Sequence, residues 1–381
     1  MEHSPLNPAP RDQPVQPSLP PELVSAILDH LPAVSPDQRE GYRERQNALL
    51  SLCLVSRAFC DLAQPYLWHY VDLDGGKGHT FFARTVARTD QGKHVRSLRL
   101  SGLRATHDDL SLLLPTMPNL EELSLDGGKT AWFDVMALLG EAASLRRLSI
   151  AGARLYMNYG EVPPLPHLTS LALSDIRMFT ALQSSVLQPT KLPSLRTLSI
   201  GLFRDGREPY FPRRLEALMA QLDAVQVHYT QHNHVSTDFM RGNNTAPLLT
   251  IHPTRDPIYS TYDPDPFNLP HLHYKPTDLS LLEFRRCITY LAQHVRNRVI
   301  RSIWLPPLSA LKAKALTADD HSLYREIGYW MSELAEACET YNVTLGHYTE
   351  DELGNDHIIP AAFLEYAKAI KAADDAAGVV R

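Results

Sequence analysis

The chain has 381 residues, of which 44% are hydrophobic, and its 37 basic and 43 acidic residues give a formal net charge of -6 at pH 7. The charges are scattered without a basic run, which argues against nucleic acid or an anionic membrane surface as the main partner. No stretch approaches the roughly 18 consecutive apolar residues of a transmembrane helix, and four cysteines without C-x-x-C spacing favour a reducing compartment, so we expect a cytoplasmic or nuclear protein.

The first 70 residues divide into a leader and a helical module. Residues 1–18 are Pro-rich and polar, without the apolar core of a signal peptide, and we expect them to be disordered. The segment "LPPELVSAILDHL" carries apolar residues at helical spacing after two prolines, which predicts a first helix. After a polar insert, "ALLSLCLVSRAFCDLAQ" predicts a second apolar helix that ends before Pro65. Residues 19–70 are therefore expected to form a small all-α module, near the lower size limit for an independent core.

Six segments between residues 95 and 227 repeat the pattern L-x-x-L-x-L at intervals of 23 to 27 residues, which is the period of leucine-rich repeats. Their register positions are Leu98, Leu123, Leu148, Leu171, Leu198 and Val225. One unit cannot bury its leucines alone, so the units are expected to stack with a parallel sheet on the concave face and helices on the convex face. The predicted fold class is α/β, with the small helical module followed by a leucine-rich-repeat solenoid over residues 71–350.

The pattern becomes irregular after residue 228, but we expect it to continue. The segments "PLLTIHP", "IRSIWLPP" and "YNVTLGHY" place Leu249, Ile303 and Val343 in the register of the earlier units. A long loop is expected at residues 259–276. The segment "PAAFLEYAKAIKAAD" predicts a helix within residues 351–381 that caps the open end of the solenoid, which stacked repeats require for solubility.

Residues 19–68 hold many apolar and small residues in one order. These positions are Leu19, Pro20, Glu22, Leu23, Ile27, Leu28, Leu31, Leu52, Cys53, Leu54, Val55, Ser56, Arg57, Phe59, Leu62, Ala63, Pro65, Leu67 and Trp68. Together with their place in front of the repeats, they resemble an F-box, in the arrangement of F-box proteins with C-terminal leucine-rich repeats. The insert around residues 36–47 departs from the family, because it is longer than the usual spacer between the first two helices.

The resemblance implies partners and a function. In the family, the F-box binds a Skp-type adaptor that links it to a cullin-RING ubiquitin ligase, while the repeats hold a protein substrate. The chain would then be the non-catalytic substrate-recognition subunit of an SCF-type ligase, without a cofactor. The residues that would face the adaptor are Leu19, Pro20, Leu23, Ile27, Leu28, Leu52, Val55, Ser56, Phe59 and Trp68.

Other interpretations of the same module stay open. A helical hairpin could cap the first repeat and bury the same leucines internally, because stacked repeats need atypical ends. Leu67 and Trp68 in particular are expected to anchor the module to the first repeat as well. The alternative function is a leucine-rich-repeat binding scaffold that recruits no ligase, while an enzyme has no supporting group of residues.

The residues between the register leucines are expected to line the concave face, because alternate positions of a strand point to opposite sides. Their central column is small and mildly polar, which leaves room for a protein substrate. Trp304 is a candidate anchor, since tryptophan is enriched among interface hot spots, although the loop at 259–276 could instead fold over it. The predicted substrate-binding residues are Ser97, Arg99, Glu122, Ser124, Asp126, Arg147, Ser149, Gln226 and Trp304.

Patterns typical of catalysis and metal binding add no further function. The sequence lacks the G-x-S-x-G, H-E-x-x-H, Walker A and G-x-G-x-x-G patterns. The histidines of "HYTQHNH" and "HLH" have no neighbouring cysteine to complete a zinc signature, so we expect surface-loop histidines and no metal. Cys53 and Cys60 fall on one predicted helix, about 10 Å apart by the helical rise, which favours two small buried residues over a disulfide.

Overall fold

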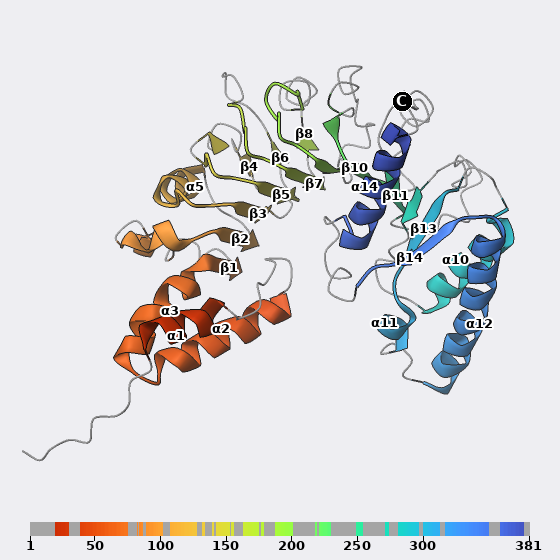
Figure 1. Cartoon of the computed structure of the whole chain (residues 1–381), viewed down its shortest axis with the longest axis horizontal. Helices are drawn as coiled ribbons and strands as arrows, with labels where there is room; N and C mark the ends of the chain where they lie inside the picture. The colour runs from red at the N-terminus through yellow and green to blue at the C-terminus, as the bar shows by residue number, and fades with distance from the viewer. Residues whose placement is uncertain are drawn as a thin grey trace, which may run out of the picture.

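An arch of parallel strands runs through the molecule (Figure 1). Helices α5 (His107–Leu113), α10 (Leu281–His294) and α12 (Ala318–Thr340) lie outside the arch, and α14 (Ala361–Ala376) lies within it. In the part of the chain that is described, the main sheet has eleven strands that follow chain order from one edge to the other, and three two-residue strands form a second, smaller sheet. The computed structural model describes residues 20–29, 39–74, 82, 84–86, 89–101, 107–127, 132–133, 139–140, 142–152, 154–155, 163–174, 177–178, 187–200, 218, 221–229, 249–253, 271–273, 281–296, 300–312, 317–349 and 359–376.

Three helices precede the sheet and share a small core of their own. That core consists of Val24, Leu28, Leu49 and Ala63, with partly buried apolar neighbours around it. Gln46 ties the module to the first strand, because its side-chain amide donates to the carbonyl oxygens of Leu67 and Tyr70, at 3.1 and 3.3 Å. The helices are α1 (Pro21–Asp29), α2 (Arg39–Cys53) and α3 (Arg57–His69).

The prediction of a single helix through residues 48–64 is wrong. A turn at residues 54–56 separates α2 from α3, and the Ser56 side chain caps α3 by accepting a hydrogen bond from the Phe59 N–H at 3.2 Å. Helix α3 does not end before Pro65 but continues through it to His69. Most of the polar insert belongs to α2, whose first residue is Arg39.

The strand register of the main sheet follows the repeat. Successive pairs join Leu98 to Leu123, Leu148, Leu171, Leu198 and Val225, and Val225 then pairs with Leu249, so this part of the predicted register is confirmed. The strands are β1 (Tyr70–Asp74), β2 (Ser97–Ser101), β3 (Glu122–Asp126), β5 (Arg147–Ala151), β7 (Ser170–Ser174), β9 (Thr197–Ile200), β10 (Ala224–Tyr229), β11 (Leu249–Pro253), β12 (His271–His273), β13 (Ser302–Leu305) and β14 (Thr344–His347).

Burial of the register leucines forms the main core. Leu98, Leu123, Leu148, Leu171 and Leu198 are almost fully buried, and the apolar residue three positions before each of them is buried as well. Burying one leucine side chain contributes about 1.5–3 kcal/mol, and in this core each leucine is buried by its equivalents in the neighbouring units. On the outer side, α5 (His107–Leu113) contributes Leu110 and Leu113 to the same core.

The far end of the sheet has a second core built on longer helices. Phe284, Ile288 and Leu291 of α10 (Leu281–His294) pack with Ile327 and Leu334 of α12 (Ala318–Thr340) and with Ile303 of the sheet. Thr317 and Asp320 form a capping box at the start of α12. A short helix, α11 (Leu308–Lys312), adds Leu311 to this core. Among the described helices, none combines the length and the apolar character needed to cross a membrane.

The predicted loop at 259–276 contains a strand that sequence patterns missed. Strand β12 (His271–His273) pairs with β11 on one side and β13 on the other. Because β12 is inserted, Ile303 lies in the row of Leu100 rather than in the predicted row of Leu98. The two-residue shift keeps Ile303 on the buried side, since strand side chains alternate with a period of two.

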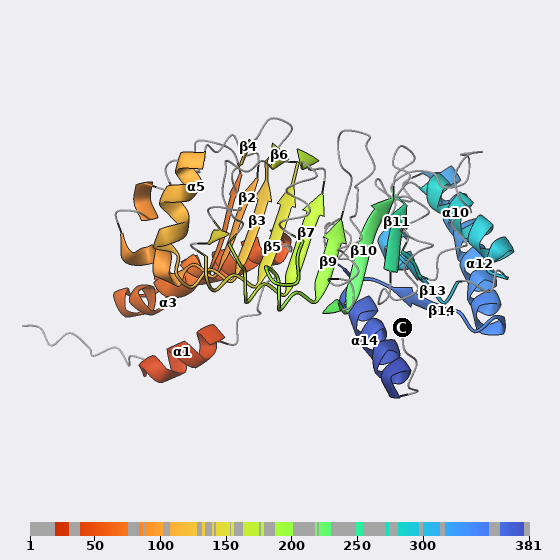
Figure 2. The ribbon, with the colours of Figure 1, turned by 90° about the horizontal axis from the view of Figure 1, so that it is seen from above.

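The C-terminal helix is present as α14 (Ala361–Ala376), and it contacts the last strand, β14, as well as strands further inside the sheet. Phe363 and Ala367 are buried with Trp304 of β13 and Ala224 of β10, and Figure 2 shows α14 starting beside these strands and extending past the edge at which they begin. The Trp304 ring meets the Phe363 ring edge-on, with centroids 5.5 Å apart. At the other end of the helix, Lys371 Nζ lies 3.1 Å from Asp223 Oδ1.

A buried polar network lies beneath α14. His271 Nδ1 is 2.8 Å from Ser302 Oγ, and the Trp304 indole N–H donates to the same oxygen at 3.0 Å. Burial lowers the pKa of His271 from 6.5 to about 3, and the positive charge of Arg301 adds to this effect. The imidazole is therefore neutral in the folded protein, and the expectation of surface-loop histidines is wrong for His271 and His273, which are both buried.

We expect Gly346→Ala to lower the free energy of unfolding by about 1–3 kcal/mol, because the added methyl group would overlap the buried Trp304 ring. Chemical denaturation followed by circular dichroism measures the change. Gly328→Ala is the matched control, since it meets open space within helix α12 and should stabilise the protein by up to about 1 kcal/mol. Equal effects of the two substitutions would contradict the packing around Trp304.

We expect the free energy of unfolding to decrease as the pH is lowered below 6.5. In this range His271 binds a proton in the unfolded chain, whereas the buried imidazole of the folded protein stays neutral down to about pH 3. The loss amounts to about 1.4 kcal/mol per pH unit, or about 2 kcal/mol at pH 5. His271→Gln should be less stable at pH 7 but lose less between pH 7 and 5. Denaturation at both pH values tests this, with the exposed His167→Gln as control; an unchanged pH slope in His271→Gln would refute it.

Candidate functional site

Helix α1 is apolar on two sides. Val24 and Leu28 face the core of the helical module, whereas Leu23 and Ile27 are about half exposed, at 52% and 46%. Leu23 and Ile27 are four residues apart and therefore lie on one face of the helix. No described residue of the chain covers that face, so α1 presents apolar surface to its surroundings.

A second exposed apolar group lies where α2 ends. Leu50 and Leu54 are four residues apart, and Val55 follows in the turn; Leu54 is 88% exposed. The three side chains project from the short connection between α2 and α3. The sequence analysis did not include Leu50 and Leu54 among the adaptor-facing residues. Their spacing of four residues indicates a shared exposed face only once the end of α2 is known.

The predicted adaptor-facing residues divide into four groups. Pro20, Leu23, Ile27, Val55 and Ser56 are exposed, and Leu52 and Phe59 are half-buried against the module core. Leu19 lies outside the described residues. The remaining two residues, Leu28 and Trp68, do not face outward.

Leu28 and Trp68 are engaged inside the chain instead of facing outward. Leu28 is 1% exposed, because it follows Val24 by four residues on the inner face of α1. Trp68 packs against the main core and stacks on Phe82, with ring centroids 5.9 Å apart, because α3 passes directly into β1. Trp68 therefore anchors the helical module to the sheet, as the second interpretation of this residue expected. Ser56 is exposed, but its hydroxyl serves as the cap of α3.

The two N-terminal cysteines lie on different helices, so the prediction of one shared helix is wrong. Cys53 is the last residue of α2, and Cys60 lies in the first turn of α3. Both thiols are free and half-buried. Burial and the neighbouring Cys60 thiol raise the pKa of Cys53, which keeps the Cys53 thiol protonated at neutral pH.

On the concave side, the N-terminal half of the sheet presents most of the predicted substrate-binding residues. Arg99, Ser124 and Ser149 are register partners on β2, β3 and β5, and all three are partly exposed. Glu122 and Arg147 form an ion pair between β3 and β5, and Asp126 is exposed at the end of β3. Ser97 belongs to the same face but is buried.

The C-terminal half of this face is closed, so Gln226 and Trp304 cannot contact a substrate in this state. Both side chains are buried, at 1% and 4% exposure. Residues of α14 cover Trp304, so the exposed-anchor interpretation is wrong, and residues 259–270 of the predicted loop lie outside the described residues. Among the predicted substrate-binding residues, those that reach solvent therefore lie on β2, β3 and β5.

The N-terminal edge of the strands carries a groove with a volume of about 440 Å³. Its residues come from four neighbouring units and include two arginines and one histidine; they are Arg96, Pro118, Asn119, Glu121, Ala143, Ser144, Arg146 and His167. Sequence analysis did not single out this groove. The sequence feature that could have indicated the groove is the residue directly before each strand, because this residue is charged in most units.

The described part of the chain contains no cluster of three or more His, Cys, Asp or Glu side chains that could hold a metal ion. His232 and His234 of the "HYTQHNH" segment lie outside the described residues. The buried pair His271 and Ser302 resembles a general base beside a hydroxyl, but Ser302 is fully buried beneath α14. A substrate cannot reach that hydroxyl in this arrangement.

Comparison with known proteins identifies the helical module. Residues 16–74 match a family model described as F-box-like, and the match spans α1, α2, α3 and strand β1. No curated protein matches the chain. The family match thus covers the segment that exposes Leu23, Ile27, Leu50, Leu54 and Val55, and it leaves residues 75–381 outside. The N-terminal region of this chain is an F-box-like domain.

Proposed function

We propose that the chain is the substrate-recognition subunit of an SCF-type cullin-RING ubiquitin ligase. Its F-box-like domain would bind a Skp-type adaptor, and the remaining chain would hold a protein substrate. The observation that carries this proposal is that the F-box-like match coincides with the apolar side chains left exposed on α1 and between α2 and α3. F-box domains typically occur in non-catalytic subunits of these ligases, and we assign this chain the same role.

The exposed apolar residues supply the binding energy for an adaptor. Burying a leucine or isoleucine side chain contributes about 1.5–3 kcal/mol, and soluble proteins rarely expose apolar side chains together without an interface. Leu23 and Ile27 offer one such face, and Leu50, Leu54 and Val55 offer another beside it. Leu28 and Trp68 contribute indirectly, because they hold α1 and α3 in place.

The parallel sheet is proposed to be a leucine-rich-repeat solenoid that recognises the substrate. The repeat spacing, the chain-order sheet and the buried register leucines support this. The open surface between β2 and β5 carries two arginines and two acids among serines, which suits a polar protein segment. Helix α14 packs on Ala224 of β10 and Trp304 of β13, so we place the substrate on β2, β3 and β5.

Ile27→Glu is expected to weaken adaptor binding about a hundredfold, because the interface would have to bury an unpaired carboxylate. Titration of the full chain with purified Skp-type adaptor, followed by calorimetry, measures the dissociation constant. Leu112→Glu provides the control, since Leu112 is an equally exposed leucine on α5, outside the F-box-like domain. Undiminished adaptor binding by Ile27→Glu would leave a binding scaffold without ligase recruitment as the better description.

Arg99→Ala is expected to reduce capture of substrate proteins about tenfold while leaving adaptor binding intact, because hydrogen bonds to charged groups contribute about 1.5–3 kcal/mol. Affinity capture with quantitative mass spectrometry compares the partners retained by the variant and by the unchanged chain. Arg325→Ala on the outer helix α12 is the matched control. An identical set and amount of captured proteins would argue against substrate binding on the open concave face.

A further inference from the structure

The N-terminal edge of the sheet carries a row of residues that stands apart from both surfaces described above. Each member directly precedes a strand, and its backbone N–H donates to the carbonyl oxygen of the preceding member at 2.7 to 2.8 Å. These bonds hold the row in register, so neighbouring members are one strand spacing, or about 4.8 Å, apart. The row consists of Arg96, Glu121, Arg146, Thr169, Arg196 and Asp223.

Arginine recurs at every second position of this row. Arg96, Arg146 and Arg196 are therefore separated by two strand spacings, or about 10 Å. Glu121 forms an ion pair with Arg96, with 3.9 Å between Oε1 and Nη1, while Asp223 is engaged by Lys371. Arg146 is exposed and has no acidic partner among the described residues. The row thus offers positive charge at regular intervals, with an acid or a neutral residue between.

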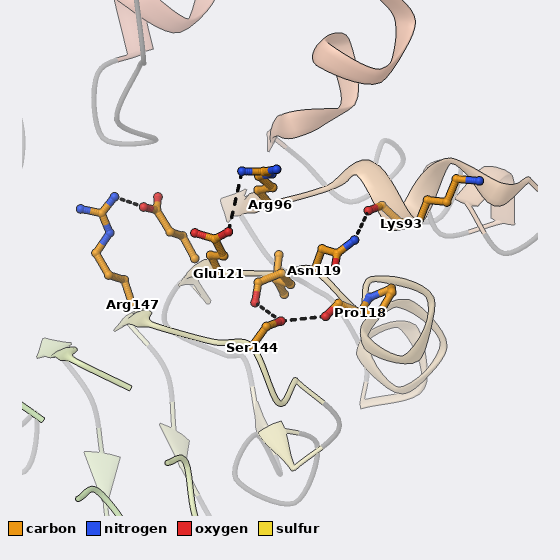
Figure 3. Close-up of polar contacts among 9 residues, drawn as sticks. Lys93, Arg96, Pro118, Asn119, Glu121, Ser144 and Arg147 are labelled. Carbon is orange, nitrogen blue, oxygen red and sulfur yellow. Dashed lines mark hydrogen bonds and ion pairs between the residues drawn. The ribbon is translucent and has the colours of Figure 1, made fainter. Parts of the chain in front are cut away.

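Hydrogen bonds between neighbouring units preform the groove beside Arg96 and Arg146, and Figure 3 shows these bonds near Arg96 and Glu121. The Asn119 amide donates to the Lys93 carbonyl oxygen at 2.7 Å. The Ser144 hydroxyl lies 2.8 and 3.0 Å from the carbonyl oxygens of Pro118 and Leu120. These contacts fix the walls of the groove before any ligand arrives, which lowers the ordering cost of binding.

We propose that this edge binds an extended acidic segment of a partner protein that carries a carboxylate at every third residue. A polyproline II chain advances about 3.1 Å per residue with three residues per turn, so every third side chain lies on one side, about 9 Å apart. That spacing matches the interval between Arg96, Arg146 and Arg196. The peptide residues between the carboxylates would be neutral or basic, because they would lie opposite Glu121 and Thr169.

The row favours such a peptide over nucleic acid. A nucleic acid carries a continuous series of phosphates, and the Glu121 carboxylate lies between the first two arginines, where it would repel such a series. A peptide can place an uncharged residue opposite Glu121. The proposed surface uses neither the F-box-like domain nor the open concave face, so it extends the proposed function without depending on it.

The test is fluorescence anisotropy of labelled peptides titrated with the full chain. The spaced peptide carries glutamates at its first, fourth and seventh positions with alanine and proline between; the clustered peptide has the same composition with three adjacent glutamates. We expect the spaced peptide to bind about tenfold more tightly than the clustered one, and Arg146→Ala to weaken its binding about tenfold. Binding should also weaken as salt rises from about 50 to 300 mM, since the contacts are exposed.

Arg325→Ala, which removes an exposed arginine from α12, is the matched variant and should bind as the unchanged chain does. Unchanged thermal unfolding of Arg146→Ala, an exposed position, separates a lost contact from a lost fold. Equal affinity for both peptides, or for Arg146→Ala and the unchanged chain, would overturn the proposal. Tighter binding of a labelled oligothymidine than of the spaced peptide would overturn it in favour of nucleic acid. The peptide titration contains no adaptor, so a negative result would bear on the charged row alone and not on the proposed recruitment of a ligase.

Discussion

Shared burial of the register leucines is the constraint on which the rest of this structure depends. Leu98, Leu123, Leu148 and their equivalents become buried only when the next unit stacks in register, because each short strand has too little surface to cover its own apolar residues. The same register sets every other feature of the sheet. It aligns the residues of the open concave face, and it spaces the charged row at the N-terminal edge.

The two ends of the stack of strands pack against different helices. At the first strand, Trp68 joins the F-box-like domain to the main core, so α1 and the turn after α2 point apolar side chains away from the sheet. Toward the other end, Trp304 and Gln226 are both buried on the concave face, and α14 packs on Trp304. The exposed apolar residues of the F-box-like domain and the proposed substrate surface on β2, β3 and β5 therefore both belong to the N-terminal half of the chain.

Sequence patterns anticipated the features that repeat and missed those that depend on tertiary contacts. The leucine period placed the strands from β2 to β11 in register, because each unit carries the same apolar spacing. Strand β12 has only three residues and shows no such spacing. The turn at 54–56 interrupts a continuous apolar run, where only the Ser56 cap indicates a break. Exposure of Leu23 and Ile27 was anticipated, as was the packing of Trp68 on the first unit, whereas burial of Leu28 and cover of Trp304 by α14 depend on packing partners that pattern alone does not specify.

Hydrogen–deuterium exchange of the full chain, with and without a Skp-type adaptor, tests the central claim most directly. The account predicts slower exchange in α1 and across the end of α2 and the start of α3, where the exposed apolar side chains lie. Exchange in strands β2 to β9 should remain unchanged, since the adaptor would not contact the sheet. Unaltered exchange in α1 and α2, or protection confined to the sheet, would contradict recruitment through the F-box-like domain.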